Sequence, residues 1–207
     1  MTGFDFADLT PTERYKMLCA AVVPRPIAWI TSIDDIGTVN AAPYSFFNVF
    51  SEDPALVIVG MNRKADGDRK DSLNNIEASG VFTVNIADAA QAEALVATAS
   101  AYPAGTGEPT ALGLRLAAAH SNGVPHLAAC PIALECTLFE CRALGPERHL
   151  VMGEVVALVA RDGLFDPDTL RIDPDGFAPL ARLHGTSYAG LGPRFDVSIP
   201  AVPKEFE

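Results

Sequence analysis

The chain has 207 residues, the length of one ordinary domain, and 49% of them are hydrophobic. Such a chain can bury a core, which excludes the disordered class. Its 15 basic and 26 acidic side chains give a formal net charge of −11. A chain this acidic repels the phosphates of nucleic acids and anionic membrane surfaces, so we expect neither as a partner.

The N-terminal segment, Met1 to Thr10, has no apolar stretch typical of a signal peptide, and no apolar run reaches transmembrane length. The four cysteines form no CxxC pair, and free thiols are typical of cytosolic proteins. We therefore expect a soluble, cytoplasmic protein. Cys136 and Cys141, which lie five positions apart, would face opposite sides of a regular strand.

The first predicted element is a helix that begins at Pro11. Thr10 is expected to cap it, with Glu13 three positions later completing a capping box. The helix should end before Pro24, because a proline restricts the conformation of the residue before it.

A β-hairpin should follow this helix. Residues 27–33 form a largely buried strand, and Gly37 provides the positive φ of the turn. Residues 38–47 form the second strand, in which Pro43 requires an edge or a bulge because it has no N–H to donate. A third strand is predicted over residues 55–61.

A short helix over residues 71–79 should follow, with Asp71 or Ser72 as its N-cap and Gly80 as its C-cap. The remaining predicted elements are, in chain order, a strand (81–86), an alanine-rich helix (89–98), a Gly/Pro loop (102–110), two long strands (132–144 and 150–160) joined by a turn at 145–148, acidic turns beyond Asp162, a short segment (180–191) and an extended piece (194–199).

Short successive strands with tight turns favour a closed or nearly closed antiparallel barrel over βαβ units. The predicted fold class is therefore mainly β with flanking helices. We expect a single domain over residues 1–207, with an N-terminal helix and a C-terminal extension after about residue 180.

Two segments could form a ligand site. Small residues, an amide and a proline gather at residues 40–45 opposite the hydroxyls of Thr31 and Ser32, so a flat ring or a phosphate could approach the backbone there. Arg69 and Lys70 precede a predicted helix N-terminus, which is the form of an anion site. Ordinary strand hydroxyls and a solvated turn are the alternatives.

The Pro24-Arg25-Pro26 segment either presents Arg25 at a cleft or only aims the next strand. Arg63-Lys64 and Arg69-Lys70 form the densest basic stretch, but it lies among aspartates and makes a local anion site at most. His149 stands alone at the start of a strand, where a histidine is more often structural than catalytic.

Several familiar sites are missing from the sequence. It has no zinc-ligand spacing, HExxH motif or EF-hand loop, so no catalytic metal is expected. P-loop, Rossmann and nucleophile-elbow motifs are also missing. A cysteine-dependent enzyme is disfavoured, because no histidine is placed in the sequence to activate a thiol.

Taken together, these residues resemble the flavin reductase-like family of FMN-binding split barrels. The resemblance runs from about Tyr15 to about Tyr188. The matching segments are Pro24–Ser32, Asn40–Asn48, Ser51–Pro54, Arg69–Ile76, Val84–Ile86, Ala133–Cys136 and His149–Val155.

The resemblance implies a Greek-key antiparallel split barrel, usually a homodimer, with FMN near the dimer interface. Arg69 and Lys70 would meet the phosphate. His149, the expected catalytic residue, would lie near the flavin or in the nicotinamide and substrate approach. The cofactor-binding residues implied by the resemblance are Trp29, Thr31, Ser32, Ala41, Ala42, Pro43, Tyr44, Ser45, Asn48, Arg69, Lys70 and Asp71.

The expected function is that of an FMN-dependent oxidoreductase, which passes reducing equivalents from NADH or NADPH to flavin or another small acceptor. The flavin performs the electron transfer itself, which is consistent with a site built from backbone, hydroxyls and an amide. The alternative is a non-catalytic FMN-binding electron carrier that acts with a protein partner.

Overall fold

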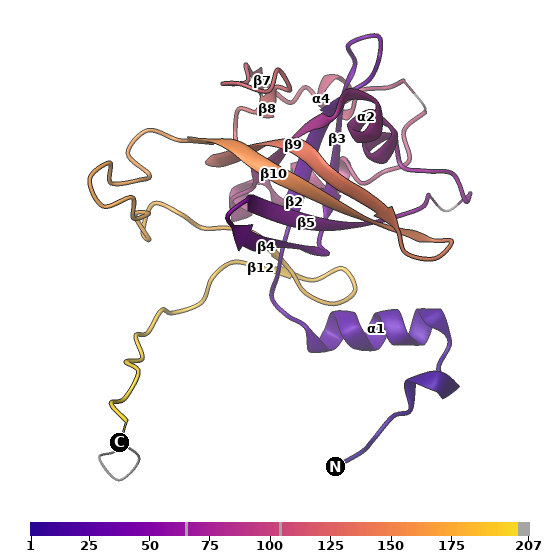
Figure 1. The fold of residues 1–207 in the computed structure, drawn as a ribbon, viewed down its shortest axis with the longest axis vertical. Helices are drawn as coiled ribbons and strands as arrows, with labels where there is room; N and C mark the ends of the chain where they lie inside the picture. The colour runs from indigo at the N-terminus through magenta and orange to yellow at the C-terminus, as the bar shows by residue number, and fades with distance from the viewer. Residues whose placement is uncertain (65, 104, 203–207) are drawn as a thin grey trace.

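The computed structural model describes residues 1–64, 66–103 and 105–202. Its centre is a seven-stranded antiparallel sheet in the order β3-β2-β6-β9-β10-β5-β4 (Figure 1). These strands are β2 (Ala28–Ile33), β3 (Val39–Tyr44), β4 (Phe47–Glu52), β5 (Ala55–Asn62), β6 (Val81–Ile86), β9 (Ile132–Ala143) and β10 (Arg148–Ala160). The mainly β, antiparallel fold class is confirmed.

Shorter elements surround this sheet. The helices are η1 (Phe6–Asp8), α1 (Pro11–Ala21), α2 (Asp71–Ser79), η2 (Ala89–Gln91), α3 (Ala92–Ala97) and α4 (Glu108–Ala111). The two-residue strands are β1 (Arg25–Pro26), β7 (Leu116–Ala117), β8 (His126–Leu127), β11 (Ala181–Arg182) and β12 (Tyr188–Ala189). Among the described residues, no helix is both long and apolar enough to cross a membrane.

The order of the strands makes the sheet curl into a barrel. β3 and β4 are the first and last strands of the sheet, yet only Ser45 and Phe46 separate them in the chain. The two edges must therefore approach each other, and the N–H of Gly60 on β5 donates to the carbonyl of Phe46 at 2.7 Å. We call Ser45–Phe46 the seam of the barrel.

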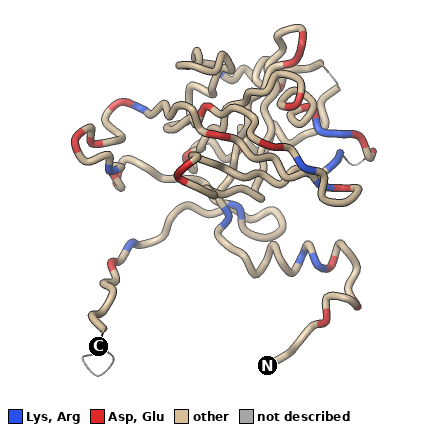
Figure 2. The backbone as a smooth tube through the Cα atoms, viewed as in Figure 1, with Lys and Arg blue, Asp and Glu red and all other residues tan. Residues whose placement is uncertain are grey.

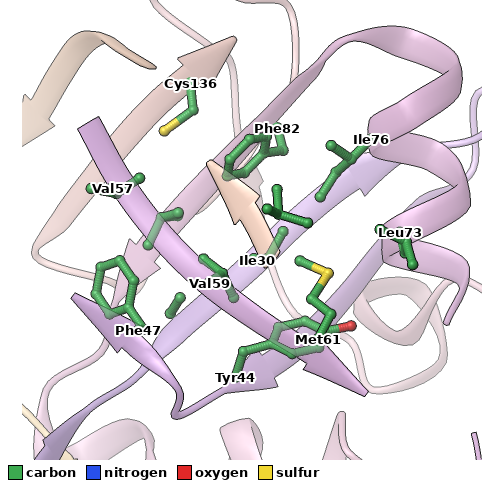
Figure 3. Packing of buried hydrophobic residues seen from close by; sticks show 13 residues of the cluster. Ile30, Tyr44, Phe47, Val57, Val59, Met61, Leu73, Ile76, Phe82 and Cys136 are labelled. Atoms are coloured by element: carbon green, nitrogen blue, oxygen red, sulfur yellow. The ribbon is translucent and has the colours of Figure 1, made fainter. Parts of the chain in front are cut away.

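The main hydrophobic core fills the inside of this barrel (Figure 3). Ile30 and Phe82 are completely buried there, and α2 contributes Leu73 and Ile76 to the same cluster. A second cluster outside the barrel contains Trp29, so neighbouring residues on β2 face opposite layers. This strand is covered on both sides, which explains its nearly continuous apolar sequence.

Several local predictions are confirmed. Thr10 caps α1, with its Oγ1 accepting from the Glu13 N–H at 3.3 Å while the Glu13 carboxylate accepts from the Thr10 N–H at 2.8 Å. Gly80 ends α2 with a φ of 73°, and Gly37 turns the first hairpin with a φ of 89°. Pro43 lies in β3, which is an edge strand as its missing N–H requires.

Other predictions are wrong. The strand expected over residues 38–47 ends at Tyr44, and β4 was not predicted. The N-cap of α2 is Lys70 rather than Asp71 or Ser72. The helix expected at 89–98 is divided into η2 and α3, α4 begins inside the predicted loop, and Arg148 belongs to β10 rather than to a turn.

The expected opposite orientation of Cys136 and Cys141 is also wrong. Leu138 pairs with Gly153 and Glu140 with Met152, so Phe139 is an extra residue in β9. A β-bulge of this kind shifts the alternation of side chains by one position. Both cysteines therefore contact the inner core.

Arg25 has a structural role in this fold. It is 7% exposed, and its guanidinium donates to the carbonyls of Cys19 at 2.6 Å and Val22 at 3.0 Å. It also donates to the carbonyl of Leu183 at 2.7 Å. Arg25 thus joins the end of α1, which lies apart from the main sheet in Figure 1, to the segment after β11.

Candidate functional site

A cleft of about 810 Å³ lies beside the seam, a volume within the usual range for small-molecule sites. α1 forms one wall, the seam and the end of β3 form another, and β5 with the start of β10 forms the floor. The lining residues are Pro11, Thr12, Tyr15, Pro43, Tyr44, Ser45, Phe46, Gly60, Asn62, Arg63, Lys64, Lys70, Glu147 and Arg148.

The cleft is basic although the chain as a whole carries a net charge of −11. Its lining contains the cations Arg63, Lys64, Lys70 and Arg148, together with one carboxylate, that of Glu147. Figure 2 shows basic segments on the right, near α2 and the β9–β10 turn. Such a local field favours an anionic ligand in a protein that otherwise repels anions.

Two of these cations have partners within the chain. Arg63 donates to the carbonyl of Pro146 at 2.7 Å and to that of Gly67 at 2.9 Å. Lys64 forms an ion pair with Asp71 at 2.8 Å. These contacts hold the loop before α2 against the β9–β10 turn and so fix one end of the cleft.

Lys70 brings the N-terminus of α2 to the cleft. It is the N-cap residue, and no side-chain hydrogen bond caps the helix within the described part of the chain. The first N–H groups of a helix have no partner inside the helix, and together with the helix dipole they attract anions. Lys70 adds a full positive charge at the same place.

Three predicted residues from β3 and the seam also line the cleft: Pro43, Tyr44 and Ser45. Tyr44 is 6% exposed, and its hydroxyl makes no hydrogen bond of standard geometry with the described residues. This hydroxyl is buried in the inner core beside Ser72 of α2, so it does not open into the cleft. Asp71 reaches the site indirectly, through its ion pair with Lys64.

Other predicted residues lie in the interior instead. Trp29 donates from Nε1 to Thr98 Oγ1 at 2.9 Å, and Thr31 donates to the carbonyl of Pro125 at 2.8 Å. Ser32 is completely buried and accepts from the amide of Asn75 at 3.2 Å. These polar groups are satisfied by the chain itself, and none of the three residues lines the cleft.

Arg69 and His149 both lie near Glu77 of α2, and neither lines the cleft. Arg69 forms an ion pair with Glu77 of α2 at 2.5 Å and does not line the cleft. His149 pairs with Met61, which faces the barrel interior, whereas the adjacent Arg148 faces the cleft. Alternation along β10 therefore separates His149 from the basic cleft.

The last three predicted residues make no direct contribution to the cleft lining. Ala41 is completely buried, and its N–H donates to the carboxylate of Glu108 at 2.8 Å. Ala42 packs against the inner core, and Asn48 is exposed on β4, where its side chain accepts from the N–H of Val49.

The sequence analysis did not identify Tyr15 and Arg148 as site residues, and it included Phe46 only within the segment Asn40–Asn48. The three form a stack in which the Tyr15 and Phe46 ring centroids are 6.0 Å apart and the Arg148 guanidinium lies 4.6 Å from the Phe46 centroid. They come from α1, the seam and β10, so no local motif joins them. In the sequence, the position of Arg148 next to His149 was the one feature that could have indicated its place in the site.

Fold and site together define a class: an antiparallel split barrel with an anion-attracting cleft beside its seam. The chain belongs to the flavin reductase-like family, because the model of the flavin reductase like domain matches residues 20–181.

Two solved structures and one curated relative are similar to this chain over most of its length. The 2-nitrobenzoate 2-nitroreductase of Pseudomonas fluorescens is 35% identical with a TM-score of 0.90, and the match covers 98% of this chain and 99% of that one. Component B of nitrilotriacetate monooxygenase from Bacillus cereus is 33% identical with a TM-score of 0.90, over 95% and 98% of the two chains. An uncharacterised protein of Deinococcus radiodurans is 39% identical over 89% of this chain and 83% of its own length.

Proposed function

We propose that this protein is an FMN-dependent oxidoreductase that takes reducing equivalents from NADH or NADPH and passes them to flavin or another small acceptor. The observation that carries the proposal is the basic cleft beside the α2 N-terminus, in a chain that belongs to the flavin reductase-like family. Two relatives at 35% and 33% identity carry the names of a nitroreductase and a monooxygenase component, which supports redox chemistry.

The residues of the cleft fit FMN. Lys70 and the first N–H groups of α2 would hold the phosphate, and Pro43, Tyr44 and Ser45 would line the rest of the cofactor. When bound, FMN supplies the hydride and electron transfer, so the protein needs only to bind, orient and shield it.

The side chains around the cleft perform these tasks. Pro43 has no N–H, so the outer side of β3 cannot donate a strand-to-strand hydrogen bond at this position. α1 covers the cleft with Pro11, Thr12 and Tyr15, and Arg25 fixes the end of that helix.

We further propose a cytoplasmic homodimer. Val49 and Phe50 on β4 are 69% and 64% exposed, and with Leu134 and Val155 they line an apolar hollow of about 450 Å³. Exposed apolar surface of this kind is typical of a protein interface. Phe50→Asp should therefore shift the mass measured by light scattering from dimer to monomer, whereas Ile36→Asp, in an exposed turn, should not.

The experiment for cofactor binding compares FMN with riboflavin, which lacks the phosphate. Lys70→Ala should weaken FMN by about 10- to 100-fold, as expected for a charge-assisted contact, and leave riboflavin nearly unchanged. The adjacent Arg69→Ala and the exposed Arg115→Ala serve as controls. Equal weakening of both flavins by Lys70→Ala would contradict the phosphate assignment.

The experiment for turnover is an anaerobic titration of the FMN-loaded protein with NADH and NADPH. Rapid loss of the oxidised flavin absorption is expected with at least one of them. Flavin that stays oxidised with both nucleotides but accepts electrons from a protein donor would identify an electron carrier instead. A chain that takes up no FMN would refute the proposal itself.

A further inference from the structure

Arg148 differs from the other cations of the cleft in its surroundings. Arg63 and Lys64 are held by carbonyls and by Asp71, and Lys70 lies at the helix N-terminus. The guanidinium of Arg148 has no hydrogen bond or ion pair with the described residues, although it is half-buried and lines the cleft. Its observed contact is with the face of the Phe46 ring, at 4.6 Å.

The backbone around Arg148 is shaped for this contact. Arg148 pairs with Asn62 of β5, and Gly60 lies two residues before Asn62 on the same face of that strand. A Cβ atom at Gly60 would lie 3.1 Å from Phe46 Cβ and 3.7 Å from an Arg148 guanidinium nitrogen. Glycine at this position therefore gives the ring and the guanidinium room to lie against β5.

A guanidinium stacked on a ring keeps the N–H groups at its edge available. These donors form a planar fork that matches a carboxylate with two parallel hydrogen bonds. The stack also leaves apolar surface beside the charge, because Tyr15, whose ring is 6.0 Å from Phe46, is 52% exposed. A positive fork next to an exposed aromatic ring is complementary to a flat organic anion.

We propose that Arg148, Phe46 and Tyr15 form a second subsite of the cleft, which binds the carboxylate and ring of a planar aromatic acid as the second substrate. The proposal rests on the proposed function, since the aromatic acid would be the acceptor that the reduced flavin meets. The subsite is distinct from the α2 N-terminus. Lys70 would hold the cofactor phosphate, and Arg148 would select the substrate that reacts with the reduced cofactor.

The test uses benzoate as the anionic probe and benzamide as its neutral counterpart, with FMN-loaded protein. Benzoate binding is measured by the perturbation of the flavin spectrum and by competition in steady-state turnover. Arg148→Met retains an unbranched side chain for packing on Phe46 but removes the charge, and Arg148→Lys retains the charge but not the fork. Arg142→Met, an exposed cation of β9 outside the cleft, is the matched control.

Arg148→Met should weaken benzoate by about 10- to 100-fold, while benzamide and FMN change by less than about threefold. Arg148→Lys should be intermediate, and Arg142→Met should behave as the unmodified protein does. Unfolding temperatures of all variants check that the barrel is intact.

Three results would overturn the proposal. Benzoate binding that is not stronger than benzamide binding would remove the anion preference. FMN weakened as much as benzoate by Arg148→Met would place Arg148 on the cofactor. A rise in the KM for NADPH but not NADH, with benzoate unchanged, would identify a nucleotide phosphate as the ligand.

The proposed function and this subsite can fail separately. If the chain takes up no FMN, benzoate and benzamide binding to the cofactor-free protein is measured by calorimetry with the same variants. A charge-dependent preference for benzoate that Arg148→Met removes would then support the subsite although the flavin assignment had failed. If the chain does take up FMN, the absence of a charge-dependent preference for benzoate in the FMN-loaded protein would refute the subsite alone.

Discussion

The carboxylate of Glu108 accepts a hydrogen bond from the backbone N–H of Ala41 at 2.8 Å. β3 is an edge strand, so this N–H has no strand partner on that side, and α4 supplies a side-chain partner instead. The Asn40 amide lies between Glu108 and α2: its NH₂ group donates to Glu108 at 3.3 Å, and its oxygen accepts from Ser72 Oγ at 2.8 Å. Glu108 thereby connects the loop that carries α4 to the first turn of α2.

Glu108 should make stability depend on pH. Burial raises the pKa of this carboxyl above its ordinary value, and the hydrogen bond from Ala41 opposes the rise only in part. The folded protein therefore binds a proton more readily than the unfolded chain, and the free energy of unfolding should fall as pH rises through the interval between the two pKa values. Denaturant titrations from pH 4 to 8 should show this slope, which Glu108→Gln should reduce and the exposed Glu93→Gln should not.

Among the described residues, Glu135 should be the buried carboxylate whose loss lowers the free energy of unfolding most. It is completely buried, and burial alone would raise its pKa, but hydrogen bonds from the N–H groups of Asn122, His120 and Ser121 hold the pKa below its ordinary value. Its stabilisation is present at neutral pH and is lost as pH falls through the folded pKa. Glu135→Gln should cost about 3 kcal/mol or more in unfolding free energy, because an NH₂ group would face backbone donors. The exposed Glu140→Gln on the same strand should cost less than about 0.5 kcal/mol.

Gly153 allows Phe82 to lie across β10 inside the barrel. A Cβ atom at this position would overlap the Phe82 ring and lie 3.2 Å from Cys136 Cβ. Gly153→Ala should therefore destabilise the protein by about 1–3 kcal/mol through overpacking. Gly190→Ala, where an added Cβ meets nothing within 4 Å, is the control, and thermal unfolding measures both. Equal unfolding temperatures for the two variants would contradict this account.

Three of the four cysteines, Cys130, Cys136 and Cys141, should be unreactive in the native protein. Burial raises the pKa of Cys130 and of Cys136 to about 12, and burial together with Glu77 raises that of Cys141 to about 12. Because the thiolate is the reactive form, a thiol reagent at pH 7.5 should modify these residues slowly until denaturant is added. Rapid modification of one of them in the native state would revive the thiol-enzyme alternative.

The parts of the fold that depend on short-range chemistry could be predicted. The capping box at Thr10 and the left-handed Gly80 are decided within a few residues, and the confinement of Pro43 to an edge follows from its missing N–H. β4 could not be predicted in this way. It exists because Phe47–Glu52 pairs with β5, and the sequence from Asn40 to Asn48 gives no sign of the break at the seam.

The site shows the same division. Lys70 and the segment from Pro43 to Ser45 lie where local pattern and family resemblance indicated a ligand. Thr31 was expected beside them, but its hydroxyl bonds to Pro125, 94 positions away. Arg148 was assigned to a turn. Its contact with Phe46 could not be predicted, because that contact depends on how the barrel closes.

The seam has a consequence for the lifetime of the protein in a cell. Ser45 and Phe46 join the two edges of the barrel and also line the cleft, so a ligand in the cleft contacts the place where the barrel closes. Occupancy should slow hydrogen exchange at the Gly60 N–H, which bonds to Phe46 across this junction. Chains that lack their ligand would open there first and be degraded sooner, so the abundance of the protein would follow the supply of its cofactor.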